Sequence, residues 1–205
     1  MASLVQQSAA IAFSTALSNT TAGNLLVLCI NTNGGVSAVS DGVNTWVHAI
    51  TSTSGGSNTS QIWYAENIVH TAGTLTVTIT GGGGPVLWLS EWSGIAISSS
   101  LESTNTIAGL VSGPVLGPSL TNTHNADLLI CVTTPDHVNA TAVSAPWTGM
   151  VVTSGIIWGA YYLPGSTVTS QATFNVSDTY SSSGAVFSTP VAPPPTNTPL
   201  MFLVF

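Results

Sequence analysis

Strict alternation of apolar and hydroxyl side chains is the pattern that most constrains the fold of this chain. Residues 74–80 read TLTVTIT, in which leucine, valine and isoleucine alternate with threonine. Successive side chains of a strand point to opposite faces, so this segment predicts a strand with one buried face and one solvated face. No comparable amphipathic helical periodicity occurs elsewhere in the sequence. The alternation is typical of an antiparallel all-β protein.

Similar runs recur along the chain and are separated by turn residues. Short clusters such as Asn33-Gly34-Gly35 and Asp41-Gly42 carry the residues that favour turns. Many short strands at such intervals indicate a sandwich or a barrel, and 205 residues can form a single domain of this kind. Besides 74–80, we predict strands at residues 25–31, 45–50, 61–68, 86–92, 128–133, 155–163, 167–175 and 183–188.

The two halves of the chain also resemble each other. LVLCI at residues 26–30 matches LLICV at 128–132, and IWYA at 62–65 matches IWGA at 157–160. Two stacked copies of a four- or five-strand unit are what a double Greek key requires. Chance similarity between strand-rich halves is the alternative, because β patterns are repetitive. We predict an antiparallel β-sandwich of jelly-roll type with two similar halves.

The predicted domain organisation follows from this repetition and from a change of composition. A single sandwich should occupy residues 1–189, with halves at about 11–97 and 124–189 and a crossover at 98–123. Residues 190–199, PVAPPPTNTP, cannot build a ladder and should form an extended linker. For the apolar end of the chain we predict strand addition to a neighbouring subunit, folding back onto its own sandwich being the alternative. Its residues are Leu200, Met201, Phe202, Leu203, Val204 and Phe205.

The charge of the chain excludes several classes of function. It contains no lysine or arginine and seven acids, for a net charge of −7. Binding to nucleic acids needs cations that displace counterions, and anionic membranes attract polybasic segments, so we expect neither partner. Walker-type phosphate binding and Schiff-base chemistry lack their lysine. The N-terminus does not resemble a signal peptide, and no run of about 18 apolar residues predicts a membrane span.

Candidate catalytic and binding residues are few. Glu66 and Glu91 could be the paired carboxylates of a glycosidase, but no motif fixes their separation. The four histidines lack metal-ligand spacing and the acids form no calcium loop. We therefore expect no enzymatic activity, no metal and no cofactor. Trp88 and Trp92 lie four apart on one predicted strand and hence on one face. That face could be an aromatic platform for a surface glycan, or it could pack in the core or at a subunit contact.

Two further features leave alternatives open. Cys29 and Cys131 each lie in an apolar run, and are either two buried thiols or a disulfide between adjacent strands. N-x-S/T sequons matter only where a glycosylation system acts on the protein. They begin at Asn19, Asn58, Asn139 and Asn175.

Several segments together resemble a known β-sandwich domain. They are TAGNLLVL at 21–28, VSAVSDGVNTW at 36–46, IWYAENI at 62–68, TLTVTIT at 74–80 and LSEWSGI at 89–95. Their order is similar to that of a domain found in bacterial secreted proteins and in phage structural proteins. The resemblance extends from residue 12 to about residue 189, although this chain lacks the basic residues usual in such domains. It implies a jelly roll on a virion or extracellular surface and carries over no catalytic residues.

These observations favour a structural role. We expect a non-catalytic assembly protein, such as a virion decoration, cement or appendage subunit, or an extracellular filament subunit. Its partners would be other copies of itself or a capsid or filament protein. The absence of lysine fits this expectation, because lysines normally keep sheet edges apart. A carbohydrate-binding or adhesive module is the alternative.

Overall fold

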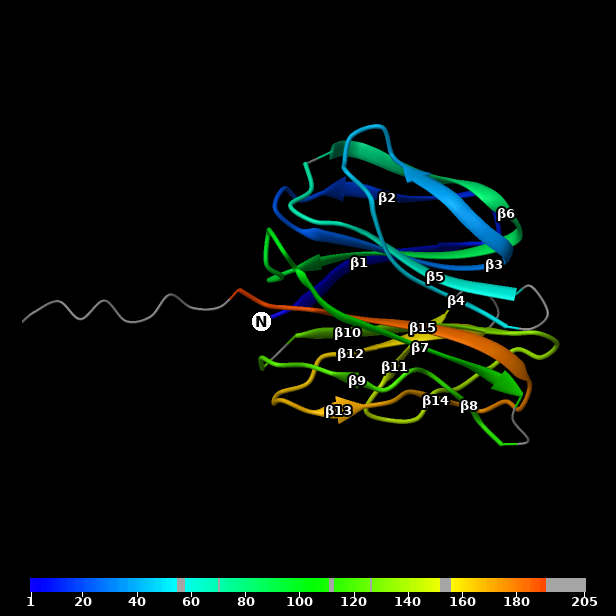
Figure 1. Ribbon diagram of the computed structural model, residues 1–205. Coiled ribbons are helices and arrows are strands. Elements are labelled where there is room, and N and C mark those ends of the chain that lie inside the picture. The colour runs from blue at the N-terminus through cyan, green and yellow to red at the C-terminus, as the bar shows by residue number, and fades with distance from the viewer. Residues whose placement is uncertain (55–57, 70, 111–112, 126, 152–155, 191–205) are drawn as a thin grey trace, which may run out of the picture.

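The computed structural model describes residues 1–54, 58–69, 71–110, 113–125, 127–151 and 156–190. Within these residues every regular element is a β-strand, and every strand pair is antiparallel (Figure 1). Two multi-stranded sheets pack face to face. The predicted all-β antiparallel sandwich is therefore confirmed. Among the described residues, no helix has the length and apolar character to cross a membrane.

The first sheet is built from the N-terminal part of the chain. Its order is β1-β6-β3-β5-β4, and β2 pairs with the first half of β6. The strands are β1 (Ser3–Ala10), β2 (Ser14–Thr20), β3 (Leu25–Ser40), β4 (Val47–Thr53), β5 (Asn58–Ala65) and β6 (Thr71–Ser93).

The second sheet is built from the C-terminal part, in the order β11-β12-β10-β15-β7. Its strands are β7 (Leu101–Leu110), β10 (Leu128–Pro135), β11 (Thr148–Val151), β12 (Ile157–Tyr162) and β15 (Thr179–Phe187). Two short ladders lie on its outer side in Figure 1. They pair β8 (Val115–Leu116) with β14 (Thr173–Phe174), and β9 (Leu120–Thr121) with β13 (Thr169–Ser170).

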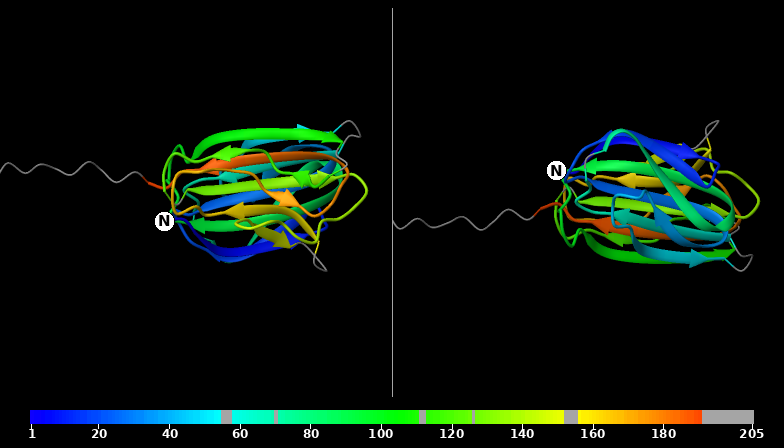
Figure 2. Two further views of the ribbon diagram at one scale, coloured as in Figure 1. Left: turned by 90° about the horizontal axis from the view of Figure 1, so that it is seen from below. Right: turned by 90° about the horizontal axis from the view of Figure 1, so that it is seen from above.

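The strand orders of the two sheets correspond position by position. In each sheet the strand carrying the LVLCI or LLICV segment, β3 or β10, is central. Its neighbours are β5 and the end of β6 in the first sheet, and β12 and β15 in the second. The strands of both sheets run along one long axis (Figure 2). Each sheet thus draws on one half of the sequence.

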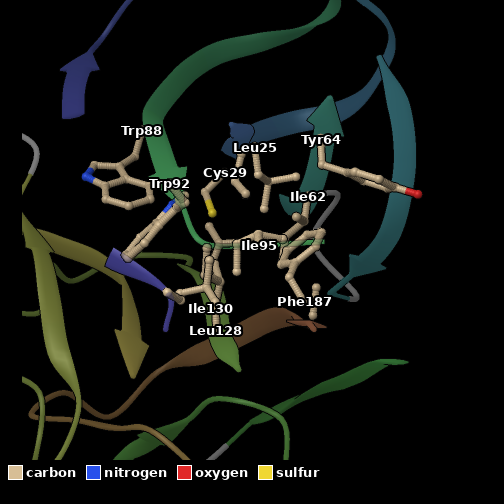
Figure 3. Close-up of a cluster of buried hydrophobic side chains, with 14 of the residues drawn as sticks. Leu25, Cys29, Ile62, Tyr64, Trp88, Trp92, Ile95, Leu128, Ile130 and Phe187 are labelled. Carbon is tan, nitrogen blue, oxygen red and sulfur yellow. The ribbon is translucent and has the colours of Figure 1, made fainter. Parts of the chain in front are cut away.

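An apolar cluster fills the space between the two sheets (Figure 3). Leu25, Val27 and Cys29 point from β3 toward Leu128 and Ile130 of β10, and all five are at most 2% exposed. The opposite faces of the same strands contribute to two outer clusters, one for each sheet. Both central strands are therefore buried on both faces, which explains why their sequences are continuous apolar runs rather than alternating ones.

β3 and β6 are long because each contributes to two layers. β6 begins in the outer layer beside β2, bends at residues 81–84, and then enters the sheet beside β1. Gly81, Gly82 and Gly84 have φ of 91°, 73° and 52° at this bend. A Cβ on Gly82 would lie 3.0 Å from the side chain of Thr32. Only glycine combines this backbone conformation with this close approach of two strands.

The structure corrects the pairing of the two halves that the sequence match implies. Aligning residues 26–30 with 128–132 makes Cys29 the counterpart of Cys131. In the structure Cys29 faces the other sheet, whereas Cys131 belongs to the outer cluster. Structurally equivalent residues of the two halves are therefore offset by one position from the sequence match. An offset of one residue exchanges the two faces of a strand. The two cysteines are buried and form no disulfide.

Candidate functional site

The predicted glycan platform is wrong. Trp88 and Trp92 do share one face, but they are only 2% and 0% exposed because that face packs against the second sheet. The ring of Trp92 meets Tyr161 edge-on at 5.0 Å, and its Nε1 donates a hydrogen bond to Ser90 Oγ at 2.7 Å. A buried ring cannot stack on a sugar, so both tryptophans serve the core (Figure 3).

The two acids considered for glycosidase chemistry belong to separate structural networks. Glu91 is fully buried and accepts hydrogen bonds from Gln6 Nε2, Thr21 N and Asn24 Nδ2 at 2.6, 2.7 and 2.7 Å. Glu66 accepts hydrogen bonds from the backbone N–H groups of two residues in the loop before β7. The structure does not bring them together as a pair across a cleft.

Backbone capping is the general use of acids in this protein. A carboxylate that accepts backbone N–H bonds ties a loop to its neighbouring strand. Among the described residues, at least five acids accept such a bond: Asp41, Glu66, Glu91, Asp127 and Asp178.

Asp178 holds the loop after β10 and also pairs with a histidine. It accepts bonds from the backbone of Val138 and Thr179 and contacts His137 Nδ1 at 3.0 Å. Burial opposes ionisation of Asp178, but these hydrogen bonds prevail and lower its pKa. The pKa of His137 is raised by the hydrogen bond and by the negative charge of Asp178. His137 and Asp178 lie 41 residues apart in the sequence, so it is the fold that brings them together.

A second titratable cluster was not predicted from the sequence. Glu102, His124 and Asp127 place one ligand-type atom each within 4.8 Å of one another. Burial and the neighbouring Asp127 carboxylate raise the pKa of Glu102. Asp127 is fully buried and fixes the chain after β15 by accepting bonds from Thr189 N and Oγ1. These contacts hold together β7, the loop before β10 and the chain just after β15.

A large concave feature among the described residues is a cleft at the end of the sandwich where β6 bends. This bend lies opposite the N-terminus in Figure 1. We refer to the cleft as the end cleft. Its volume is about 710 Å³, and both halves of the chain contribute to it. It is lined by Asn31, Asn33, Gly34, Asn58, Gly82, Gly83, Gly84, Thr134, Pro135, Asp136 and Trp158.

Two local irregularities shape the end cleft. The register of β3 against β6 shifts repeatedly between Asn31 and Ala38, which splays the strand ends beside the glycine bend. The register of β11 against β12 shifts between the pairs Gly149–Ala160 and Val151–Ile157. Trp158 lies within this second irregularity. It lines the end cleft, whereas Trp63, its counterpart in the sequence match, packs on the outer face of the first sheet.

Polar groups of the end cleft are only partly paired. Asn58 Nδ2 donates a hydrogen bond to Asp136 Oδ1 at 2.7 Å, joining the two halves across the cleft. By contrast, Asn31 Nδ2, Thr134 Oγ1 and Trp158 Nε1 are buried atoms without a hydrogen-bond partner among the described residues. Buried polar atoms are normally paired, so three such atoms at one cleft mark it as unusual.

The sheet edges form another candidate interaction surface. β1 and β4 bound the first sheet, and β7 and β11 bound the second. Three of these edge strands carry a valine that is about half exposed: Val5 at 47%, Val47 at 41% and Val151 at 50%. The predicted assembly contact at residues 200–205 lies outside the described residues, as does nearly all of the predicted linker.

Comparison of the chain with protein-family models, with curated proteins and with solved structures gave no match.

Proposed function

We propose that this protein is a non-catalytic structural subunit that assembles with copies of itself through the edges of its sheets. The observation that carries the proposal is the state of the edge strands. β1, β4 and β11 contain no lysine, arginine, glutamate, aspartate or proline, and each has a half-exposed valine. Natural sandwiches protect such edges with charges, prolines or bulges; each of these three strands has one register shift against its neighbour, but none has the charges or prolines.

Strand addition is the contact that suits these edges. The outer side of an edge strand offers backbone donors and acceptors, which pair with a second strand while alternate side chains fill its pockets. β1 is eight residues long and β4 is seven, enough for a ladder of several bonds. With no cations and −7 net charge, association would be opposed only by weak general repulsion, screened within about 8 Å at physiological ionic strength.

The use of the acids supports a role without catalysis. Most carboxylates cap backbone groups, as described above, and Asp136 holds Asn58. The resemblance to secreted and phage structural domains suggests a virion or extracellular setting, as a decoration, appendage or filament subunit. The apolar segment 200–205 would supply a second contact between neighbouring subunits.

Light scattering coupled to size exclusion, together with electron microscopy of the full chain, tests the proposal. We expect oligomers or particles whose fraction rises as pH falls from 7 toward the sequence pI of about 4.4, where net charge vanishes. Val5→Lys, Val47→Lys and Val151→Lys place charges on the edges and should each reduce assembly while preserving the melting temperature. Val43→Lys is the control, because Val43 is equally exposed, at 52%, but lies in a loop.

A monomer at both pH values and at high concentration would contradict the proposal. Equal assembly by the three edge variants and the loop variant would instead exclude the edges as the contact. Removal of residues 196–205 tests the C-terminal segment separately. If the truncated protein no longer assembles but keeps its melting temperature, the segment forms a contact between subunits.

A further inference from the structure

We propose that the end cleft is a binding site for a neutral, hydroxyl-rich saccharide. Assembly through the sheet edges makes no use of this cleft, so the two proposals are independent. The cleft is open, its volume of about 710 Å³ lies within the usual range for small-molecule sites, and its lining is polar and apolar in about equal parts. Its unpaired donors, its charge and its one aromatic side chain together select the chemical class of the ligand.

The unpaired groups call for a ligand with oxygen acceptors. Asn31 is 6% exposed and Thr134 is 1% exposed, yet Asn31 Nδ2 and Thr134 Oγ1 have no partner among the described residues. Trp158 Nε1 is a third group without one, and it can only donate. A buried unpaired donor costs about 1–3 kcal/mol, so a ligand oxygen that pairs with it gains a corresponding advantage.

The acceptor in the same cleft calls for a ligand that also donates. Asp136 is partly exposed, and its Oδ1 already accepts bonds from Asn58 Nδ2 at 2.7 Å and Ser54 Oγ at 3.3 Å. These donors fix the carboxylate, and no hydrogen bond to Oδ2 occurs among the described residues. A sugar hydroxyl donates and accepts at once, so a polyhydroxyl ligand can satisfy Asp136 and the three unpaired groups together.

Charge excludes the other oxygen-rich ligands. Phosphates, sulfated glycans and sialylated glycans need a cation, and this chain has no lysine or arginine. Among the described residues that line the cleft there is no histidine, and the one ionisable group is acidic. A metal ion is disfavoured as well, because Asp136 is the one carboxylate among the described residues that line the cleft. The remaining class is neutral and hydroxyl-rich.

Trp158 supplies the apolar part of the recognition. The ring is half-buried and lines both the end cleft and a small apolar cavity behind it, formed by Cys29, Trp88 and Met150 among others. A partly exposed indole ring suits the C–H face of a pyranose. Residues 82–84, which also line the cleft, are glycines, so a ligand can approach the backbone of β6 there without meeting side chains of that strand.

A glycan array carrying neutral hexose and N-acetylhexosamine oligosaccharides beside their sulfated and sialylated counterparts tests the proposal. We expect binding to neutral members only. The neutral oligosaccharide with the strongest signal is then titrated into the full-length protein by calorimetry. Trp158→Ala and Asn33→Ala should each raise its Kd, the former by about tenfold or more. Asn33 is exposed, so its replacement leaves the core intact even if Trp158→Ala perturbs folding.

Trp63→Ala is the matched control, since Trp63 is also half-buried but packs on the outer face of the first sheet. Its Kd should equal that of the unmodified protein. Three outcomes would overturn the proposal: no neutral glycan bound at millimolar concentration, preferential binding of anionic glycans, or affinity unaffected by both Trp158→Ala and Asn33→Ala. Each of these outcomes leaves the edge-assembly proposal untouched, because the lysine variants test it separately.

Discussion

Replacing Glu91 with glutamine should destabilise the fold by about 2–4 kcal/mol, although the change is nearly isosteric. Glu91 Oε1 accepts bonds from Thr21 N and Asn24 Nδ2, and the amide oxygen of glutamine can keep both. The new NH₂ then takes the place of Oε2 and faces Gln6 Nε2, a donor, across 2.6 Å.

Rotation of the Gln6 amide would relieve that clash only by breaking other bonds. Gln6 Nε2 donates to Ser18 O at 2.9 Å, and Gln6 Oε1 accepts from Ser18 N at 3.3 Å. Either way the variant loses a charge-assisted bond, worth about 1.5–3 kcal/mol, and leaves a donor unpaired inside the protein. β1 and β2 should therefore loosen from β6 before the rest of the sheet.

Equilibrium unfolding in urea, followed by tryptophan fluorescence, measures the free energy of unfolding. Glu66→Gln is the matched control, because Glu66 is partly exposed and water can replace its two backbone bonds. We expect the control to cost less than about 1 kcal/mol. A cost below about 0.5 kcal/mol for Glu91→Gln would refute the reasoning, since a fully buried carboxylate with three donors cannot be that dispensable.

Two further predictions follow from the titratable groups. In an NMR titration His137 should show a pKa above its usual value of about 6.5 and His48 one below it, because Asp178 stabilises the charged form of His137 while burial disfavours that of His48. As far as the titration of His137 is concerned, the stability supplied by its contact with Asp178 should be complete below pH 6.5 and should fade as pH rises through the folded-state pKa. Asp178→Asn should lower the pKa of His137 toward its usual value, and an unchanged pKa would contradict the pairing. Burial raises the pKa of Cys131 to about 12 and that of Cys29 well above its usual value. Both thiols should therefore stay unmodified when the native protein is treated with iodoacetamide at pH 8, and both should be alkylated in urea, as mass spectrometry can show.

Most of the strands could be predicted because the residue pattern that marks a strand lies within a short stretch of sequence. The alternation at residues 74–80 and the apolar run of β3 report directly which faces are buried. β1 and β2 were missed, because their sequences are polar and their side chains are largely half-exposed, as expected of strands with one partner. The predicted strand at 167–175 is in fact two short strands, β13 and β14, that pair with different partners.

The candidate sites were harder to predict than the strands. Spacing correctly placed Trp88 and Trp92 on one face, but spacing cannot say whether a face meets water or a second sheet. Trp158 was taken as the equivalent of Trp63, and a register shift in β12 gives it a different environment. No local signal marks such a shift, because it depends on the partner strand.

The end cleft lies where the two halves of the chain meet. This position explains its form, and it also explains why no sequence motif marks the cleft. Asn31, Asn58 and the glycine bend come from the first half, whereas Thr134, Asp136 and Trp158 come from the second. Stacking two similar sheets buries their shared face along most of its length, as in the cluster around Leu25 and Ile130. At the glycine bend β6 leaves the first sheet for the outer layer, so the two sheets part at that end. Side-chain groups such as Asn31 Nδ2 and Thr134 Oγ1 are left there without a hydrogen-bond partner among the described residues, and a fold without cations or catalytic pairs can still offer a binding surface.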